Sequence, residues 1–219
     1  MKKIQKRGVK LEKLIEKSCL DFTAALASKA PVPGGGGAAA LAGALGTALG
    51  TMAANFTAGK KKYAAYEADI QVILQKTARI QNRLLALVDE DAEAFAPLSA
   101  AYAIPKDAPE RAEVLEAAAL KACQAPLEMA ALCGEAVGLL EELLEKGSVL
   151  LLSDVGCGAL LCGAALESAA LNVFINTGTL QNREQAHAVE AEVDALREQY
   201  VPKAAAIAET VRRRVRKEG

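Results

Sequence analysis

The sequence contains one histidine, no tryptophan and few aromatic residues of any kind. Its five cysteines form no CxxC pair, so the chain lacks the clustered ligands that a zinc site needs. The scarcity of aromatics argues against a base-stacking platform, and the net charge of −1 gives no general attraction for nucleic acid. We therefore expect no metal, no nucleic-acid partner, and buried, reduced thiols in a cytoplasmic protein.

Runs of Val, Ile and Thr are also rare, whereas Ala, Leu, Glu and Lys dominate, which predicts an all-α fold. At 219 residues the chain is expected to form a single domain over 1–219, with loosely ordered basic ends at 1–10 and 212–219. The N-terminus continues into a charged amphipathic segment, so no signal peptide is expected. The uncharged stretch 31–59 is long enough to cross a membrane, but its Ala and Gly content favours burial in protein.

Apolar spacing predicts a bundle of long, partly kinked helices. Pro97, Pro126 and Pro202 are expected to kink or break the helices that contain them. Ser153 is expected to cap the helix that it begins. The predicted helices are Leu11–Ala30, Ala38–Thr57, Tyr66–Ala101, a helix from about Pro109 to Leu132, Glu135–Glu145, Ser153–Asn176 and Asn182–Arg214.

The stretch Pro31–Tyr63 is the most unusual part of the chain. Pro33 precedes a run of four glycines, Gly34–Gly37, which predicts a loop, because glycine loses the most backbone entropy on ordering. Backbone N–H groups of such a loop, just ahead of a helix, make a candidate anion site. The small residues of the following helix allow another backbone or a ligand to approach closely; a purely structural, close-packed helix is the alternative. Neither a P-loop nor a dinucleotide-binding glycine motif is present.

Two further groups of residues are candidates for chemistry. Extending the apolar stripe of the third long helix places Asp91 on its buried face, whereas Asp89 points elsewhere. Burial raises the pKa of a carboxyl toward values useful for acid/base catalysis. The structural alternative is a buried Asp that caps or bridges a neighbouring helix. In the apolar helix Ser153–Asn176, four polar residues share a face: Asp154, Ser168, Asn172 and Asn176. This face predicts a polar pocket, a subunit interface or a contact with another helix end. His187 is expected at the surface.

Four segments in order, PVPGGGGAAALAGALG, NFTAGKKKY, LVDEDAEAF and SDVGCGALL…NVFIN, resemble the cyclodeaminase/cyclohydrolase family. That family comprises the C-terminal domain of formiminotransferase-cyclodeaminase and stand-alone bacterial relatives. The resemblance extends from about Phe22 to Asn176. It implies an all-helical, oligomeric folate enzyme, most simply a homodimer, which uses no metal and no tightly bound cofactor.

The resemblance also implies a reaction and a set of site residues. The reaction is conversion of 5-formiminotetrahydrofolate to 5,10-methenyltetrahydrofolate with release of ammonia, in one-carbon metabolism and histidine degradation. Its catalytic aspartate falls on Asp91 or, second, on Asp89. The family pattern commonly has serine where this chain has Gly37, which leaves backbone amides as the binding elements there. Substrate-binding candidates are Pro33, Gly34, Gly35, Gly36, Gly37, Asp154, Asn172 and Asn176, with Lys60, Lys61 and Lys62 meeting a glutamate or polyglutamate tail.

Two alternatives to cyclodeaminase remain open from sequence. A methenyltetrahydrofolate cyclohydrolase needs an acid/base group beside the same bridge carbon, with water as the nucleophile. A non-catalytic helical assembly module, with the small-residue helix as the oligomer seam, is the second alternative.

Overall fold

The computed structural model describes residues 13–217, which form a helical bundle without a strand in that range. The prediction of an all-α fold is confirmed. The predicted N-terminal basic end lies outside the described residues. The α-helices are α1 Cys19–Leu26, α2 Gly35–Asn55, α3 Glu67–Tyr102, α4 Arg111–Lys146, α5 Leu152–Thr177 and α6 Arg183–Arg216, and short 3₁₀ helices are η1 Leu14–Glu16, η2 Lys61–Tyr66 and η3 Val149–Leu151.

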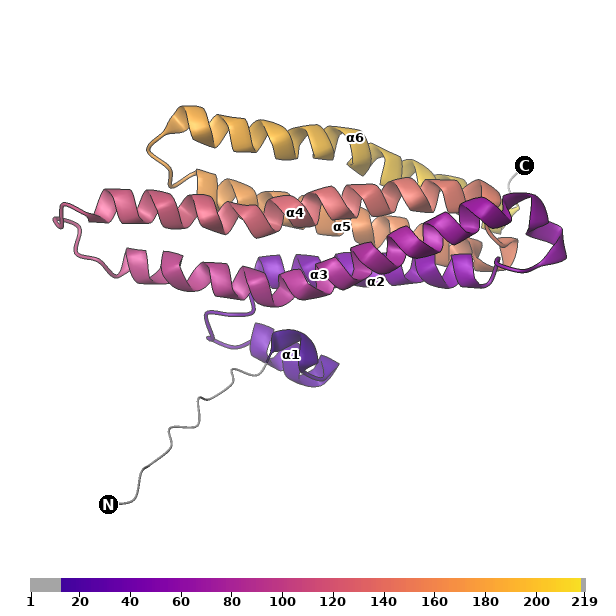
Figure 1. Ribbon diagram of the computed structural model, residues 1–219, viewed down its shortest axis with the longest axis horizontal. Helices are drawn as coiled ribbons and strands as arrows, with labels where there is room; N and C mark the ends of the chain where they lie inside the picture. The colour runs from indigo at the N-terminus through magenta and orange to yellow at the C-terminus, as the bar shows by residue number, and fades with distance from the viewer. Residues whose placement is uncertain (1–12, 218–219) are drawn as a thin grey trace, which may run out of the picture.

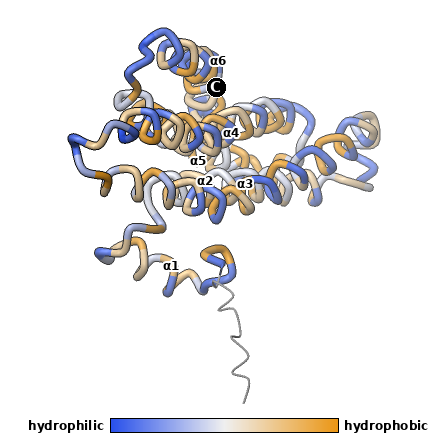
Figure 2. The backbone as a smooth tube through the Cα atoms, turned by 60° about the vertical axis from the view of Figure 1, so that its left-hand side comes forward, coloured by the Kyte–Doolittle hydropathy of each residue, from blue (hydrophilic) through white to orange (hydrophobic). Residues whose placement is uncertain are grey.

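The long helices form two layers (Figure 1). Helices α3 and α4 lie side by side in front of α2 and α5, and α6 runs along the edge formed by α4 and α5. Helix α2 is antiparallel to α5, since Gly35 lies beside Asn172 and Gly46 beside Gly158. Helix α1 is set apart from the bundle, as Figure 2 also shows. The side of α2 and α5 that faces away from α3 and α4 carries no further layer in the described chain.

Helices α2 and α5 pack closely against each other in the second layer. Each is long and apolar enough to span a membrane, but about half of each apolar window is buried within the protein. A side chain at Gly46 would have its Cβ 2.9 Å from the carbonyl oxygen of Gly158, which is closer than real Cβ contacts. Glycine therefore lets the two backbones touch, so the predicted close packing of this small-residue helix is observed.

Two predicted helix breaks are wrong. The structure has one continuous α4 through Pro126 and Gly134, and one continuous α6 through Pro202. Gly134 is required for packing, because a Cβ there would lie 2.5 Å from Cδ2 of Tyr200 in α6. Helix α3 likewise continues through Pro97 to Tyr102.

Some predicted helix ends also differ. The segment predicted as one helix, Leu11–Ala30, is interrupted at Ser18, whose extended backbone starts α1 and whose hydroxyl accepts from the Asp21 N–H at 3.1 Å. Helix α5 begins one residue before Ser153, after η3, so Ser153 is not its cap. Residues 212–216, predicted as part of a loosely ordered end, continue α6, and the Arg214 guanidinium pairs with Glu145 of α4 at 2.6 Å.

Candidate active site

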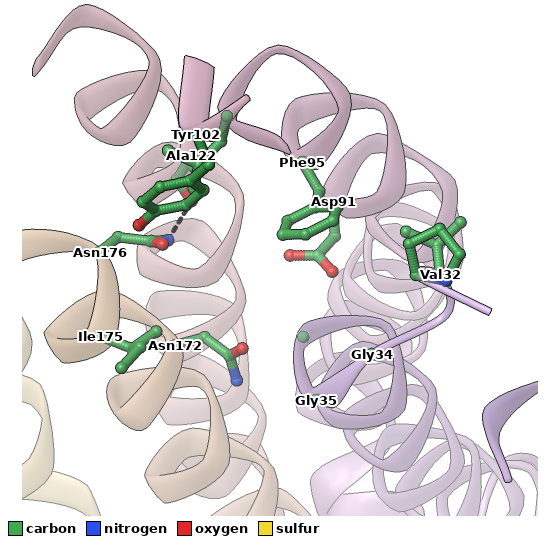
Figure 3. Close-up of a pocket in the computed structure, with 13 residues that line it drawn as sticks. Val32, Gly34, Gly35, Asp91, Phe95, Tyr102, Ala122, Asn172, Ile175 and Asn176 are labelled. Atoms are coloured by element: carbon green, nitrogen blue, oxygen red, sulfur yellow. Dashed lines mark hydrogen bonds between the residues drawn. The ribbon is translucent and has the colours of Figure 1, made fainter. Parts of the chain in front are cut away.

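A cavity of about 280 Å³ opens where the start of α2 meets α3, α4 and α5. The structure brings together in its wall six residues that the sequence predicts from distant segments (Figure 3). They are Gly34, Gly35, Gly36, Asp91, Asn172 and Asn176.

The glycine run forms the first turn of α2. This corrects the prediction of a loop over Gly34–Gly37, because only Gly34 is extended, as the N-cap, and Gly35–Gly37 are helical. Glycine is required at position 36 because a side chain there has no space. A Cβ on Gly36 would lie 2.6 Å from Asp91 Oδ2 and 2.5 Å from its Cγ, so any other residue would collide with the carboxyl group. The backbone N–H of Gly37 donates a hydrogen bond to this carboxyl group.

Asp91 sits on the pocket side of α3 with its carboxyl group directed toward this glycine turn (Figure 3). Burial raises the pKa of Asp91 above its ordinary value, and the hydrogen bond from Gly37 opposes that shift. Such a carboxylate is a stronger base when ionised and a usable acid when protonated. Asp91 therefore has the burial and the position in a cavity that an acid/base group needs.

Asp89 has a different position. Its Oδ1 accepts a hydrogen bond of 2.6 Å from the backbone N–H of Leu14 and so holds η1 against α3. Asp89 does not line the cavity. Of the two aspartates that the sequence proposes for catalysis, the geometry favours Asp91 and gives Asp89 a structural contact.

Asn172 and Asn176 occupy successive turns of α5 on the opposite wall (Figure 3). The Asn172 amide donates to the carbonyl of Ser168 in its own helix at 2.8 Å, and the Asn176 amide donates to the carbonyl of Ala122 in α4 at 3.1 Å. Both amide groups are thus oriented by protein carbonyls. Their side-chain oxygens remain available to accept hydrogen bonds from a polar ligand.

Other predicted site residues lie elsewhere. Asp154 is in the first turn of α5, whereas the asparagines are near its last turn. Lys60 and its neighbours Lys61 and Lys62 follow the far end of α2, which spans roughly 30 Å at 1.5 Å per residue. Pro33 is buried beneath the glycine turn, and with Gly37 it lies behind the cavity wall. Within one chain, neither the lysines nor Asp154 joins the pocket.

Sequence reasoning missed several residues of the wall. Phe95, Leu98 and Tyr102 follow Asp91 along α3 at spacings of four, three and four, and all line the cavity. The signal was present, because these spacings continue the stripe that selects Asp91. Val32 and Ile175 also line it. No periodic pattern identifies those two, since one lies in a loop and the other on an exposed helix side.

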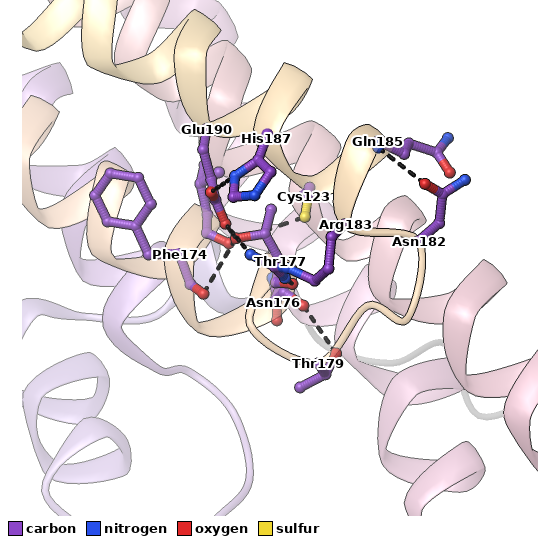
Figure 4. Close-up of polar contacts among 11 residues, drawn as sticks. Cys123, Phe174, Asn176, Thr177, Thr179, Asn182, Arg183, Gln185, His187 and Glu190 are labelled. Carbon is purple, nitrogen blue, oxygen red and sulfur yellow. Dashed lines mark hydrogen bonds and ion pairs between the residues drawn. The ribbon is translucent and has the colours of Figure 1, made fainter.

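A polar corner supports the end of α5 that carries Asn176 (Figure 4). The Thr177 hydroxyl donates to Glu190 of α6 at 2.7 Å, and Arg183 donates to the Thr177 carbonyl at 2.8 Å. His187, 68% exposed at its side chain, lies 3.1 Å from Glu190. This corner fixes α5 to α6, and His187 is at the surface as predicted.

Comparison with known proteins identifies the family of this chain. A family model described as formiminotransferase-cyclodeaminase matches residues 18–195, which is most of the chain. The chain belongs to this family. It is 42% identical over 166 residues to a methenyltetrahydrofolate cyclohydrolase of Methylorubrum extorquens, covering 74% of this chain and 80% of that protein. The predicted resemblance is thus confirmed.

Two further relatives place the chain within the cyclodeaminase/cyclohydrolase family. It is 30% identical over 169 residues to mouse formimidoyltransferase-cyclodeaminase, but this match spans only 31% of the mouse protein. It also resembles the crystal structure of a formiminotetrahydrofolate cyclodeaminase from Thermotoga maritima, with a TM-score of 0.80 and 27% identity over 91% of this chain and 99% of that one. The relatives named here are enzymes whose names refer to one-carbon chemistry.

Proposed function

We propose that the cavity binds a tetrahydrofolate derivative and that Asp91 is the acid/base group of a reaction at the carbon bridging N5 and N10. The observation that carries this proposal is the buried carboxyl of Asp91 over Gly36, in a cavity between the glycine turn and Asn172. The carboxyl group has a raised pKa and reaches open space. Family membership supplies the class of substrate.

The first candidate reaction is hydrolysis of 5,10-methenyltetrahydrofolate. The sequence alone places cyclodeaminase first; the 42% identity to a named cyclohydrolase, over 80% of that protein, reverses the order. Ionised Asp91 accepts a proton from water as the hydroxide adds to the cationic bridge carbon. The protonated carboxyl then donates to N5 as the N5–carbon bond breaks. The new hydroxyl loses its proton to solvent and leaves the formyl group on N10.

The second candidate is the cyclodeaminase reaction, supported by the named activity of the Thermotoga maritima neighbour. There N10 attacks the carbon of the protonated, cationic formimino group, Asp91 accepts the N10 proton, and the same proton is delivered to the departing NH2 group. The carbon–nitrogen bond breaks, ammonia leaves, and the methenyl bridge remains. One carboxyl in one position serves both reactions, because each moves a single proton between two atoms bonded to the bridge carbon.

The side chains around Asp91 fit a ligand with one flat polar ring system. Phe95 and Tyr102 offer aromatic surface along α3, and Asn172 offers an amide on the opposite wall. We place the pterin and the bridge between these walls. A polyglutamate tail, the absence of a tight cofactor and a role in histidine degradation stay predictions, as does cytoplasmic location.

Purified protein incubated separately with methenyltetrahydrofolate and with 5-formiminotetrahydrofolate tests the proposal. Methenyl absorbance that decays faster than in buffer, without ammonia, identifies the cyclohydrolase; methenyl formation with stoichiometric ammonia identifies the cyclodeaminase. We expect Asp91→Asn to lower kcat by about 10²–10⁴-fold and Asp89→Asn to keep most of the activity. If neither substrate turns over but tetrahydrofolate raises the melting temperature, the cavity binds folate without this chemistry. No turnover and no thermal shift would favour the assembly module.

A further inference from the structure

Three of the long helices contain an interior proline: Pro97 in α3, Pro126 in α4 and Pro202 in α6. Proline has no backbone N–H, and its ring clashes with the carbonyl group four residues earlier, so that carbonyl loses its helical hydrogen bond. Pro97 and Pro202 are exposed, as are the residues four positions before them. Pro126 and Ala122, whose carbonyl it releases, are both buried, so that carbonyl needs a partner other than bulk water.

The partner of the Ala122 carbonyl is a residue of the candidate active site. The side-chain amide of Asn176 donates a hydrogen bond of 3.1 Å to this carbonyl (Figure 3). Ala122 and Asn176 both line the cavity that contains Asp91. Because a carbonyl can only accept, the NH2 group of Asn176 faces α4, and the side-chain oxygen is left to accept from a ligand. Pro126 thus releases the group that orients Asn176.

The backbone of Asn176 is fixed independently of this hydrogen bond. The next residue, Thr177, is buried, and its hydroxyl donates to Glu190 of α6 at 2.7 Å (Figure 4). Its carbonyl accepts from Arg183 at 2.8 Å. These contacts hold the last turn of α5 to α6 whichever way the Asn176 side chain turns. The orientation of the Asn176 amide therefore depends on its contact with α4.

Asn172, one turn earlier in α5, provides an internal comparison. Its amide donates at 2.8 Å to the carbonyl of Ser168, which in a continuous helix also accepts from the backbone N–H of Asn172. The Ala122 carbonyl has lost its helical donor, and the amide of Asn176 takes the place of the missing N–H. Alanine at position 126 would supply that N–H and compete with the Asn176 amide for the same carbonyl.

We propose that Pro126 is a positioning residue of the active site, which fixes the Asn176 amide so that its oxygen accepts from an N–H group of the ligand ring. The identity of this ring rests on the proposed function: a pterin has amino and ring N–H donors. A ring with an acceptor at that place would leave the amide oxygen unpaired and bind less well. Proline is the least favourable residue in a helix interior, and such departures from local preference are expected at functional sites.

A crystal structure of the Pro126→Ala variant tests the positioning without any substrate. The restored N–H should bond to the Ala122 carbonyl, and the Asn176 amide should turn away beyond hydrogen-bond distance. Pro202→Ala is the matched control, because it also removes an interior helical proline, but an exposed one, and it should leave the Asn176 contact unchanged. Both variants should melt no lower than the wild type, since alanine favours the helix interior.

Two structural outcomes would overturn the proposal. The first is a Pro126→Ala structure in which the Asn176 amide still donates to the Ala122 carbonyl. The second is a Pro126→Ala protein that does not fold, because the proline ring would then be needed for packing.

Steady-state kinetics test whether this positioning reaches the ligand. Pro126→Ala should raise KM about fivefold, the effect of one oriented hydrogen bond, with little change in kcat, because Asn176 moves no proton. Asn176→Ala should raise KM at least as much, and adding Pro126→Ala to it should raise KM no further. Pro202→Ala should keep the wild-type KM. A wild-type KM in Pro126→Ala, or effects that multiply in the double variant, would overturn the proposal.

The proposed function fails through a different measurement. If Asp91→Asn keeps full activity, Asp91 is not the acid/base group, and the KM values of the Pro126 and Asn176 variants still decide the positioning. If neither folate substrate turns over, the Kd of tetrahydrofolate from thermal shifts takes the place of KM in the same comparison. Without folate binding, the crystal structure of Pro126→Ala alone decides whether Pro126 orients Asn176.

Discussion

Replacing Gly36 by alanine tests how closely the glycine turn positions the catalytic carboxyl. The added methyl carbon would lie 2.6 Å from Asp91 Oδ2, about 0.8 Å inside the usual carbon–oxygen contact of about 3.4 Å. Because Gly36 is in a helix, its backbone is held and Asp91 must move. A displacement of about 1 Å at a reacting group costs on the order of 100-fold in rate, or about 2.7 kcal/mol of transition-state stabilisation.

Folding stability should change little by comparison, since alanine favours the helix over glycine by about 0.5–1 kcal/mol and offsets part of the strain. The measurement is kcat/KM with the better of the two folate substrates, together with urea unfolding. Gly138→Ala in α4 is the matched control, because a Cβ there meets nothing within 4 Å. It should gain stability and keep its activity. Wild-type kcat/KM in Gly36→Ala would refute the argument that this turn positions Asp91.

Three other outcomes are expected. Asp91→Asn should lower kcat by about 10²–10⁴-fold. It should also stabilise the fold at pH 7, because burial raises the pKa of Asp91 and the stability that the protonated form provides is lost as pH rises through that pKa. Equal or lower stability in urea unfolding at pH 7 would contradict this expectation. Asp89→Ala should lower the free energy of unfolding in urea by about 1–2 kcal/mol, because it removes the acceptor for the Leu14 N–H, and the activity should be kept. A loss of kcat of about 100-fold would assign a catalytic role to Asp89. Burial raises the pKa of Cys123 to about 11 and that of Cys162 to about 12. Neither thiol should therefore react with a thiol reagent at about pH 8 until the protein unfolds. Labelling of either cysteine in the native protein, detected by mass spectrometry, would contradict this expectation.

The fold was predictable because its signals are local and repeated. Apolar spacing defines α3, and small residues define α2, to within a few residues. Helix α6 continues through Pro202, against the predicted break. The break predicted at Gly134 is wrong because packing overrides propensity: Gly134 makes room for Tyr200 of the neighbouring helix. That requirement belongs to a pair of helices and appears in neither helix alone.

The site was predictable in part, for the same reason. Helical phase selects Asp91 over Asp89 because it depends on one helix only. Composition suggested a glycine loop, yet Gly36 is helical, and glycine is needed there because Asp91 occupies the place of its side chain. The lysines looked close to the glycines in sequence, but a helix of roughly 30 Å separates them in the chain.

The pH dependence of kcat/KM in the wild type and in Asp91→Asn tests the central claim most directly. If ionised Asp91 is the base, wild-type kcat/KM falls as pH decreases through an apparent pKa above the ordinary aspartate value, since protonation removes the base. The residual activity of Asp91→Asn, after subtraction of the buffer reaction, should lack this acidic limb while folate binding persists. An Asp91→Asn enzyme that keeps the acidic limb, or keeps wild-type turnover, would contradict the account.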